Sequence, residues 1–211
     1  MESDITALLV DLREDEVLAA ASAARDAGTP APEVIAALQD GMRIIGDKYE
    51  AGDYYLSELI MSAEIFKRAL EVLGVDRTEV NAEAKATVVL CSVQGDIHDI
   101  GKDIVGAVLS ANGFKVVDLG VDVSAERVVQ AVRDNDARIV GLSCLLTTSF
   151  DAMRATISAL DAAGLRETVS VFVGGGPVTA DLAAQIGADG AGASAQEAVM
   201  LADGVIARGL S

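Results

Sequence analysis

A short polar segment around the only histidine of the chain has the composition of a ligand-binding loop. It reads Gln94-Gly95-Asp96-Ile97-His98-Asp99-Ile100-Gly101-Lys102-Asp103. The imidazole of His98 offers a neutral nitrogen to a metal near neutral pH, and the carboxylate of Asp96 could hydrogen-bond the second ring nitrogen and fix its tautomer. Gly95 and Gly101 would let the backbone approach a bulky group closely.

One histidine cannot hold a zinc ion alone, but it can supply one axial position to a metal that a macrocycle already holds. The two cysteines, Cys91 and Cys144, lie in apolar runs and match no zinc pattern. A bare transition-metal site is therefore not expected. A second interpretation is that Asp96 and Asp99 cap the next helix while His98 is merely exposed. The loop by itself does not decide between the two.

This loop lies inside a repeating strand–helix pattern. Apolar runs predict strands at 87–93, 115–119, 139–144, 169–173 and, more weakly, 189–191. A helix is predicted after each strand: one that begins near 100, one that ends near 134, and three over 150–163, 179–186 and 196–208. Such a pattern implies a parallel sheet with right-handed crossovers, in which ligands bind beyond the carboxyl ends of the strands. We predict an α/β fold with a flavodoxin-like (Rossmann-like) five-stranded parallel sheet domain over residues 86–211.

The first part of the chain has helical periodicity instead. Helices are predicted from residue 3 or 4 to 12, over 15–27, from Pro32 to 49 and over 56–73, separated by short loops such as the one at Gly28. Four helices with short loops favour an antiparallel bundle over residues 1–76. Residues 77–85 are polar and lack periodicity, and they are interpreted as a linker.

Composition excludes several classes of function. The formal net charge is -17, and only 3% of the residues are aromatic. Such a chain repels phosphate backbones and anionic lipids and offers few rings for base stacking, so neither nucleic acid nor a membrane is an expected partner. The acidic N-terminus does not resemble a signal peptide, no apolar run could span a bilayer, and two cysteines suit a reducing compartment. A cytoplasmic protein is expected.

Two further motifs follow predicted strands. Ser143-Cys144-Leu145 comes at the end of the third strand and Gly174-Gly175 at the end of the fourth. Taken alone, Gly174-Gly175-Gly176-Pro177 is a tight strand-to-helix turn, Ser143 a polar strand end and Ser149 a helix cap. With Asp96-x-His98-x-x-Gly101, however, the three motifs in this order resemble the cobalamin-binding domains of the methionine synthase type, over about residues 86–208.

That resemblance implies roles for individual residues. His98 would be the metal ligand, taking the lower position on cobalt that the nucleotide tail of the cofactor vacates. Asp96 would hydrogen-bond His98, and Ser149 would complete a proton relay with them. The rest of the implied cofactor-binding set comprises Asp99, Gly101, Ser143, Leu145, Thr147, Gly174 and Gly175. Of these, Ser143 and Thr147 would contact the buried benzimidazole, and the three glycines would make room for the tail. One departure is the small segment 189–194, where many relatives place an aromatic residue.

The helical region resembles the cap module that accompanies these cofactor domains and covers the upper face of the cobalt. By that resemblance, Tyr55 and Leu56 would shield the methyl-bearing face from water and oxygen, with Met61 a weaker candidate. The alternative is that these residues are ordinary bundle core, which is the preferred interpretation for Met61, Ile65 and Leu70.

A cap joined to a cofactor domain resembles the corrinoid proteins of three-component methyltransferase systems. The resemblance implies bound cobalamin (methylcobalamin or a related corrinoid) held base-off with His98 on cobalt. The chain would be a methyl-carrier subunit rather than a complete enzyme. It would accept a methyl group from a substrate-specific methyltransferase and donate it to a second methyltransferase that acts on tetrahydrofolate or a thiol coenzyme; a reductive activase is a third expected partner.

Other classes fit the residues less well. A cobalamin-dependent sensor would add a DNA-binding domain, for which this acidic chain leaves no room, and a mutase subunit would more often lack the cap. A phosphoacceptor domain would need an acidic residue where Ser143 ends the third strand and a lysine where Ala191 ends the fifth. A flavin carrier would need a Ser/Thr- and Gly-rich phosphate loop after the first strand. The sensor and the mutase subunit remain as alternatives.

Overall fold

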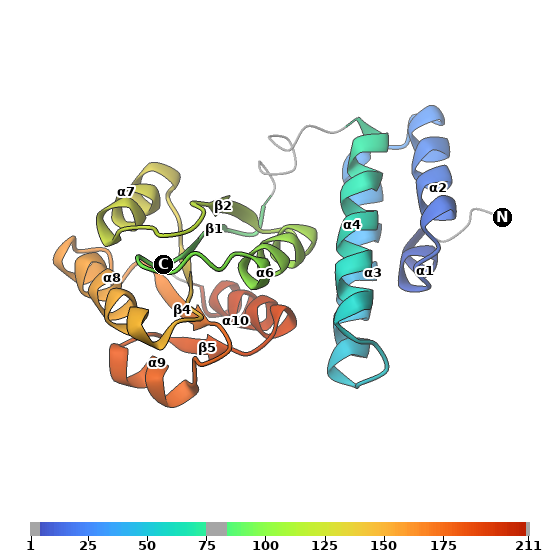
Figure 1. Cartoon of the computed structure of the whole chain (residues 1–211). Coiled ribbons are helices and arrows are strands. Elements are labelled where there is room, and N and C mark those ends of the chain that lie inside the picture. The colour runs from blue at the N-terminus through green and yellow to red at the C-terminus, as the bar shows by residue number, and fades with distance from the viewer. Residues whose placement is uncertain (1–4, 75–83, 210–211) are drawn as a thin grey trace. The chain divides into compact units, whose positions relative to one another are not determined.

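The computed structural model describes residues 5–74 and 84–209, and the chain divides into two compact units, one helical and one α/β (Figure 1). The predicted linker, 77–85, lies outside the described residues except for its last two positions. Within the described ranges, no helix is both long and apolar enough to cross a bilayer.

The helical unit contains the four predicted helices. They are α1 (Ile5–Val10), α2 (Glu14–Asp26), α3 (Ala31–Glu50) and α4 (Leu56–Leu73). α1 packs on α3, and α4 packs on both α2 and α3. Their apolar faces form a core in which Leu9, Leu38, Ile45, Leu59 and Ile65 are all buried.

Backbone geometry and capping contacts set the ends of these helices. Leu12 has a φ of +56°, so α1 ends before it rather than at residue 12. At the start of α4 the carboxylate of Glu58 accepts a hydrogen bond from the backbone N–H of Tyr55 at 2.8 Å, which is one half of a capping box. Gly74 ends α4 in the left-handed region at φ +71°. The helical prediction is therefore confirmed, with boundaries shifted by one or two residues.

The α/β unit contains a sheet of five parallel strands in the order β2-β1-β3-β4-β5. The strands are β1 (Thr87–Ser92), β2 (Lys115–Asp118), β3 (Ile139–Ser143), β4 (Ser170–Gly174) and β5 (Gly190–Gly192). This order confirms the predicted flavodoxin-like topology. Five of the six residues of β1 and four of the five of β4 are buried, because both strands are covered on their two faces.

Helices cover both faces of this sheet (Figure 1). They are α6 (Ile100–Ala111), α7 (Ala125–Asn135), α8 (Phe150–Ala162), α9 (Ala180–Ile186) and α10 (Ala195–Arg208), with a short 3-10 helix η1 (Thr147–Ser149) before α8. The main core lies between the sheet and α7, α8 and α9, where Val128, Met153, Leu160 and Val171 are buried together. In Figure 1, α6 and α10 lie on the other face.

The chain reverses direction across the sheet between β1 and β3. From β1 it passes outward to β2 on one side, and it then returns to β3 on the other side, where Ser92 is in register with Ser143. The loops after β1 and β3 therefore begin at neighbouring points of the same sheet edge. In open α/β sheets this switch point is where ligands bind, and the predicted site residues of both loops lie there.

Candidate functional site

A tight turn brings the chain from β1 into the histidine loop. Val93 forms a single parallel bridge with Val123, and Gly95 then turns the chain at φ +84°. This left-handed conformation favours glycine, and a Cβ atom at this position would lie 3.2 Å from the hydroxyl oxygen of Ser149. The Gly95 N–H donates to the carboxylate of Asp122 at 2.7 Å, and the Asp122 N–H donates to the carbonyl of Asp96 at 2.9 Å. The turn is thus tied to the loop after β2.

Asp96 is the buried centre of the site, with no exposed surface. One carboxylate oxygen accepts the backbone N–H of His98 at 3.0 Å and lies 2.7 Å from its Nδ1. The other accepts the backbone N–H groups of Leu145 and Leu146, at 2.6 and 3.0 Å. This one side chain therefore joins the loop after β1 to the loop after β3. It does not cap α6, because its hydrogen bonds all go to these two loops.

The surroundings of Asp96 keep it ionised. Burial on its own raises the pKa of a carboxyl group, but the hydrogen bonds from the His98 backbone and ring and from Leu145 and Leu146 outweigh it. The pKa of Asp96 is accordingly held well below its usual range. The neighbouring Cys144 shows the opposite effect, because burial and then the Asp96 charge raise its thiol pKa to about 11. Cys144 is therefore a neutral thiol and no candidate nucleophile.

This arrangement determines which nitrogen of His98 is available. An ionised carboxylate accepts a hydrogen bond, so Nδ1 carries a proton, and in the neutral ring the free lone pair is on Nε2. The His98 side chain is half exposed at 49%, and no hydrogen bond holds Nε2 among residues 5–74 and 84–209. Neutral Nε2, oriented by a buried carboxylate, is the form of histidine that binds metals.

Apolar side chains are exposed around the histidine. Ile97 and Ile100 are 72% and 77% exposed, and Leu145 and Leu146 are 46% and 38% exposed. All four belong to the loops after β1 and β3 or to the first residue of α6. Exposed aliphatic side chains that gather beside a polar motif mark a surface that binds an apolar group. Only Leu145 was a sequence-based candidate. The signal for Ile97 and Ile100 was an aliphatic residue on either side of His98-Asp99, and Leu146 directly follows the Ser143-Cys144-Leu145 motif.

The glycines of the site differ in what they are needed for. Gly175 has a φ of +129°, and a Cβ atom there would lie 1.9 Å from the carbonyl oxygen of Cys144. The Cys144 N–H donates to the carbonyl oxygen of Gly174 at 2.9 Å, so the turn interpretation accounts for both residues. By contrast, a Cβ atom at Gly101 would have no neighbour within 4 Å. The surface of α6 is open at Gly101, which is compatible with a bound group. That the three glycines make room for a cofactor tail stays a prediction.

The remaining cofactor-domain candidates lie at the same edge without a direct bond to His98. Ser143 is half-buried at the end of β3, Thr147 is exposed in η1, and Asp99 is exposed with its carbonyl accepting the Asp103 N–H at 2.8 Å. Ser149 is buried, but its hydroxyl is not among the hydrogen-bond partners of Asp96. The proton relay through Ser149 and the contacts of Ser143, Asp99 and Thr147 with a cofactor stay predictions.

The cap candidates form an apolar patch at the start of α4. Tyr55 is 70% exposed, Leu56 46%, Ile60 43% and Met61 49%, and we call these four residues the α4 patch. The preferred interpretation of Met61 as bundle core is therefore wrong: its position on α4 points away from the bundle. Ile65 is core as expected, and Leu70 is half-buried.

Comparison with known proteins agrees with this geometry. A family model described as "B12 binding domain" matches residues 86–200, and a second model with the same description matches residues 1–73. A corrinoid protein of Desulfitobacterium hafniense is 39% identical over 81% of this chain and 81% of its own length. The dimethylamine corrinoid protein 1 of Methanosarcina mazei is 35% identical over 93% of this chain and 91% of its own.

A solved structure supports the same relationship. The methanol:cobalamin methyltransferase complex MtaBC of Methanosarcina barkeri contains a chain that superposes with a TM-score of 0.83 at 33% identity, covering 98% of this chain and 79% of that one. The likeness extends over both the helical and the α/β unit. Together with the buried Asp96, the outward His98 and the apolar edge, it leads to one conclusion: this chain belongs to the corrinoid proteins that are built from B12-binding domains.

Proposed function

We propose that this protein carries a methyl group on a corrinoid whose lower axial ligand is His98, with the nucleotide tail of the cofactor displaced from cobalt. A substrate-specific methyltransferase would supply the methyl group, and a second methyltransferase would remove it to tetrahydrofolate or a thiol coenzyme. The observation that carries the proposal is the Asp96–His98 pair, in which a buried, ionised carboxylate holds Nδ1 and leaves Nε2 free at an apolar sheet edge.

The residues of the edge fit a corrinoid in three respects. The family's cofactor brings its metal in a macrocycle, so the protein needs to provide only one ligand. No group of three or more His, Cys, Asp or Glu side chains that could hold a bare metal ion occurs in the part of the chain that the structure describes. The exposed aliphatic side chains beside His98 suit the wide apolar face of such a ring, and the open surface at Gly101 leaves space below it.

Asp96 and His98 would act as one unit. The Asp96 carboxylate fixes the ring orientation and increases the electron density on Nε2, which strengthens the ligand. Because Asp96 is also held by Leu145 and Leu146, the ring orientation is fixed relative to the β3 loop as well as its own. When bound, the cobalt supplies the chemistry, since it can accept a methyl group and release it again.

The α4 patch would protect the reactive face. Four large apolar side chains at one helix end remain exposed in the helical unit, although many of its other apolar residues form a core. Such a surface is suited to excluding water from a reactive group. Tyr55 and Leu56, at the start of α4, are the residues that we propose shield the methyl group, with Ile60 and Met61 beside them.

The partners follow from the same role. Two of the named relatives belong by name to a dimethylamine and a methanol system, and a carrier needs one enzyme to load it and one to unload it. A reductive activase would be needed to restore the cofactor after accidental oxidation. The chain's formal charge of -17 would favour partners with basic docking surfaces.

Reconstitution with hydroxocobalamin tests the ligation directly. The wild-type holoprotein should show an absorption spectrum in which imidazole replaces benzimidazole on cobalt, and His98→Ala should lose that spectrum. Lys85→Met, whose position precedes β1 at the other sheet edge, is the matched control and should keep it. If the His98→Ala spectrum matched the wild type, ligation by His98 would be wrong.

A second experiment tests the carrier role. Methyl transfer should be measured with methyltransferases encoded beside this gene, and the loaded protein should exchange methyl groups with at least one donor and one acceptor enzyme. Binding of the corrinoid with transfer to none of them would contradict the carrier role and favour a sensor.

A further inference from the structure

Lys102 is a buried cation beside the site that the proposed function does not use. Only 2% of its side chain is exposed, and its ammonium lies 2.6 Å from Asp103 and 2.5 Å from Asp118. Burial alone would lower the pKa of Lys102, but the two carboxylates outweigh it and raise that pKa above its usual value, so the ammonium stays charged. Lysine is almost never buried in this way unless it is paired, which calls for a structural or functional reason.

A chain of hydrogen bonds connects this ammonium to the backbone of His98. The second oxygen of Asp118 accepts the Gly120 N–H at 2.9 Å, and the Gly120 carbonyl accepts the Ser92 N–H at 3.0 Å. The Ser92 hydroxyl, which is fully buried, then donates to the carbonyl of His98 at 2.6 Å. Lys102 follows His98 by only four residues. The hydrogen bonds that run from Lys102 through Asp118 and Ser92 to His98 therefore form a closed ring with the short stretch of chain between His98 and Lys102.

We infer that Lys102, Asp118 and Ser92 are positioning residues that hold the backbone of His98, so that its imidazole stays in place for the metal. We call these three residues the bracket. This inference rests on the proposed role of His98 as the cobalt ligand, and it assigns a separate function to residues that do not touch the ring.

The loop needs such support because its own secondary structure provides little. Residues 96–99 belong to no helix or strand, and α6 begins only at Ile100. Asp96 fixes the ring and the N–H of His98, but the His98 carbonyl and the start of α6 would be free to move without further contacts. The bracket holds that carbonyl from β1 and the first turn of α6 from the end of β2. A ligand must be held within about 0.5 Å of its working position to bind well.

The bracket also explains why a charged group is kept inside the protein. Asp118 ends β2 and is 42% exposed, so it could be solvated without Lys102. With Lys102 present, the strand end and the helix are joined at a fixed distance. Removing the Lys102 ammonium would therefore release Asp118 from α6, and the effect would pass along the hydrogen bonds of Gly120 and Ser92 to His98.

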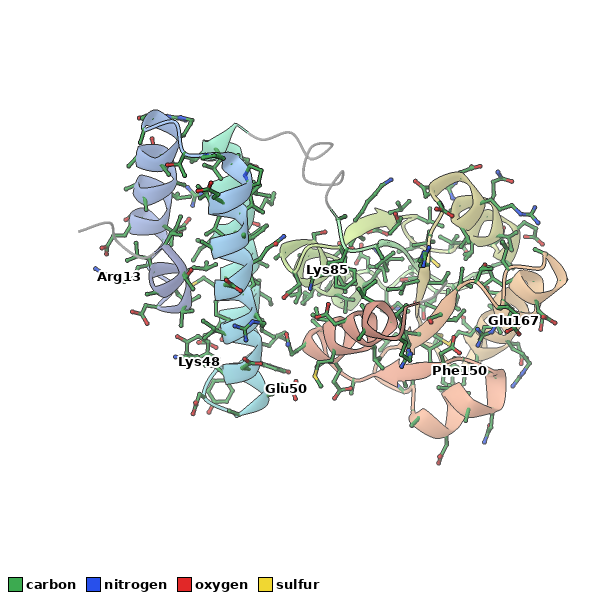
Figure 2. The ribbon with its side chains drawn as sticks, turned by 180° about the vertical axis from the view of Figure 1, so that it is seen from behind. Arg13, Lys48, Glu50, Lys85, Phe150 and Glu167 are labelled. Atoms are coloured by element: carbon green, nitrogen blue, oxygen red, sulfur yellow. The ribbon has the colours of Figure 1, made fainter. Side chains whose placement is uncertain are left out.

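The test compares variants of the bracket with a distant lysine. Ser92→Ala removes the hydroxyl that holds His98, Lys102→Met removes the ammonium, and Lys102→Arg keeps a charged donor. Lys85→Met is the control, because Lys85, which is labelled in Figure 2, also pairs with an aspartate, Asp203, at 2.8 Å. This pair is half-exposed, and Lys85 precedes β1. Each protein is labelled with ¹⁵N-histidine, which marks only His98, then loaded with hydroxocobalamin and reduced to the cobalt(II) state. Electron paramagnetic resonance then measures the twofold nitrogen splitting from the labelled imidazole, which is distinct from the threefold splitting of the cofactor's own benzimidazole.

We expect the ratio of ligated to unligated cobalt to fall about three- to tenfold in Ser92→Ala and in Lys102→Met, the effect of losing about one buried hydrogen bond. Lys102→Arg should lie closer to the wild type than Lys102→Met, and Lys85→Met should match the wild type. In the double variant Ser92→Ala/Lys102→Met, the ratio of ligated to unligated cobalt should fall by less than the product of the two single effects, because both changes break the same ring of contacts.

The outcomes separate the inference from the proposed function. No imidazole splitting in the wild type would refute the proposed ligation, whereas splitting that is equally strong in wild type, Ser92→Ala and Lys102→Met would refute the bracket alone. A purely structural role would lower the melting temperature of the apoproteins without changing the ligated fraction, and that result also counts against the bracket. If Lys102→Met fails to fold, Ser92→Ala decides, because it removes a single oxygen atom.

Discussion

The two edges of the sheet both carry a lysine–aspartate pair, yet the pairs differ in burial and in what their contacts hold. At the amino edge, Lys85 and Asp203 are 41% and 47% exposed, and a cavity of about 370 Å³ is lined by Lys85, Thr87, Asp136, Arg138, Val205 and Ile206. At the carboxyl edge, Asp96 and Lys102 are buried and their contacts converge on His98. Polar contacts that converge on the proposed ligand residue, rather than a hollow surface, mark the candidate site of this protein.

The largest effect on the carboxyl edge is expected from Gly175→Ala. The new Cβ would lie 1.9 Å from the Cys144 carbonyl oxygen at a φ of +129°, so the strand-to-turn backbone would have to move. We expect a loss of about 3 kcal/mol or more in the free energy of unfolding, in the range of overpacked and strained sites. Urea unfolding of the apoprotein measures it. A loss below about 1 kcal/mol would show that the turn adapts easily.

Asp96→Asn should have the next largest effect. The amide keeps the shape but loses the charge that accepts four hydrogen bonds, so a loss of about 2–3 kcal/mol is expected at neutral pH. Because the pKa of Asp96 is lowered in the folded state, its contribution is present above the ordinary carboxyl pKa and disappears as the pH falls through the folded pKa. The wild type should therefore lose stability below about pH 4 relative to Asp96→Asn. Parallel acid-unfolding curves would contradict this.

Gly101→Ala should separate binding from stability. The added Cβ meets no protein atom within 4 Å and lies in a helix, so the apoprotein should be unchanged or more stable by up to about 1 kcal/mol. If Gly101 makes room for the cofactor, corrinoid affinity should nevertheless fall about tenfold, the effect of a methyl group that clashes with a ligand. Equilibrium titration with hydroxocobalamin measures it, and unchanged affinity would remove Gly101 from the binding surface.

The smallest effect is expected at the amino edge. Lys85→Met breaks a half-exposed ion pair, which contributes about 0–1 kcal/mol to stability. Corrinoid affinity should be the same as in the wild type. Weaker corrinoid binding by Lys85→Met would mean that the two edges are coupled, and the comparison would no longer hold.

The fold could be predicted from the sequence because the strands are continuous apolar runs and the helices have clear periodicity. The ends shifted by one or two residues where the backbone geometry decided, as at Leu12, whose positive φ is not visible in its residue type. Met61 was misassigned because a methionine between apolar neighbours looks like core in a helical pattern, and only the packing of α4 shows that it is exposed.

The site could be predicted only in part. Residues within one loop, such as Asp96 and His98, were found from their types and spacing. The contacts that hold the loop were not, because they join residues far apart in the chain: Asp96 with Leu145 and Leu146, and Lys102 with Asp118. Lys102 gave no signal, since a lysine in the first turn of a helix is ordinarily solvated.

The most direct test of the central claim uses the fact that the chain has a single histidine. The protein, prepared without a histidine tag, is labelled with ¹⁵N-histidine, loaded with hydroxocobalamin and reduced to the cobalt(II) state. If Nε2 of His98 binds cobalt, the threefold nitrogen splitting of the unlabelled protein in electron paramagnetic resonance must become twofold in the labelled one. A splitting that stays threefold would mean that the axial nitrogen belongs to the cofactor's own benzimidazole, and His98 would not be the ligand.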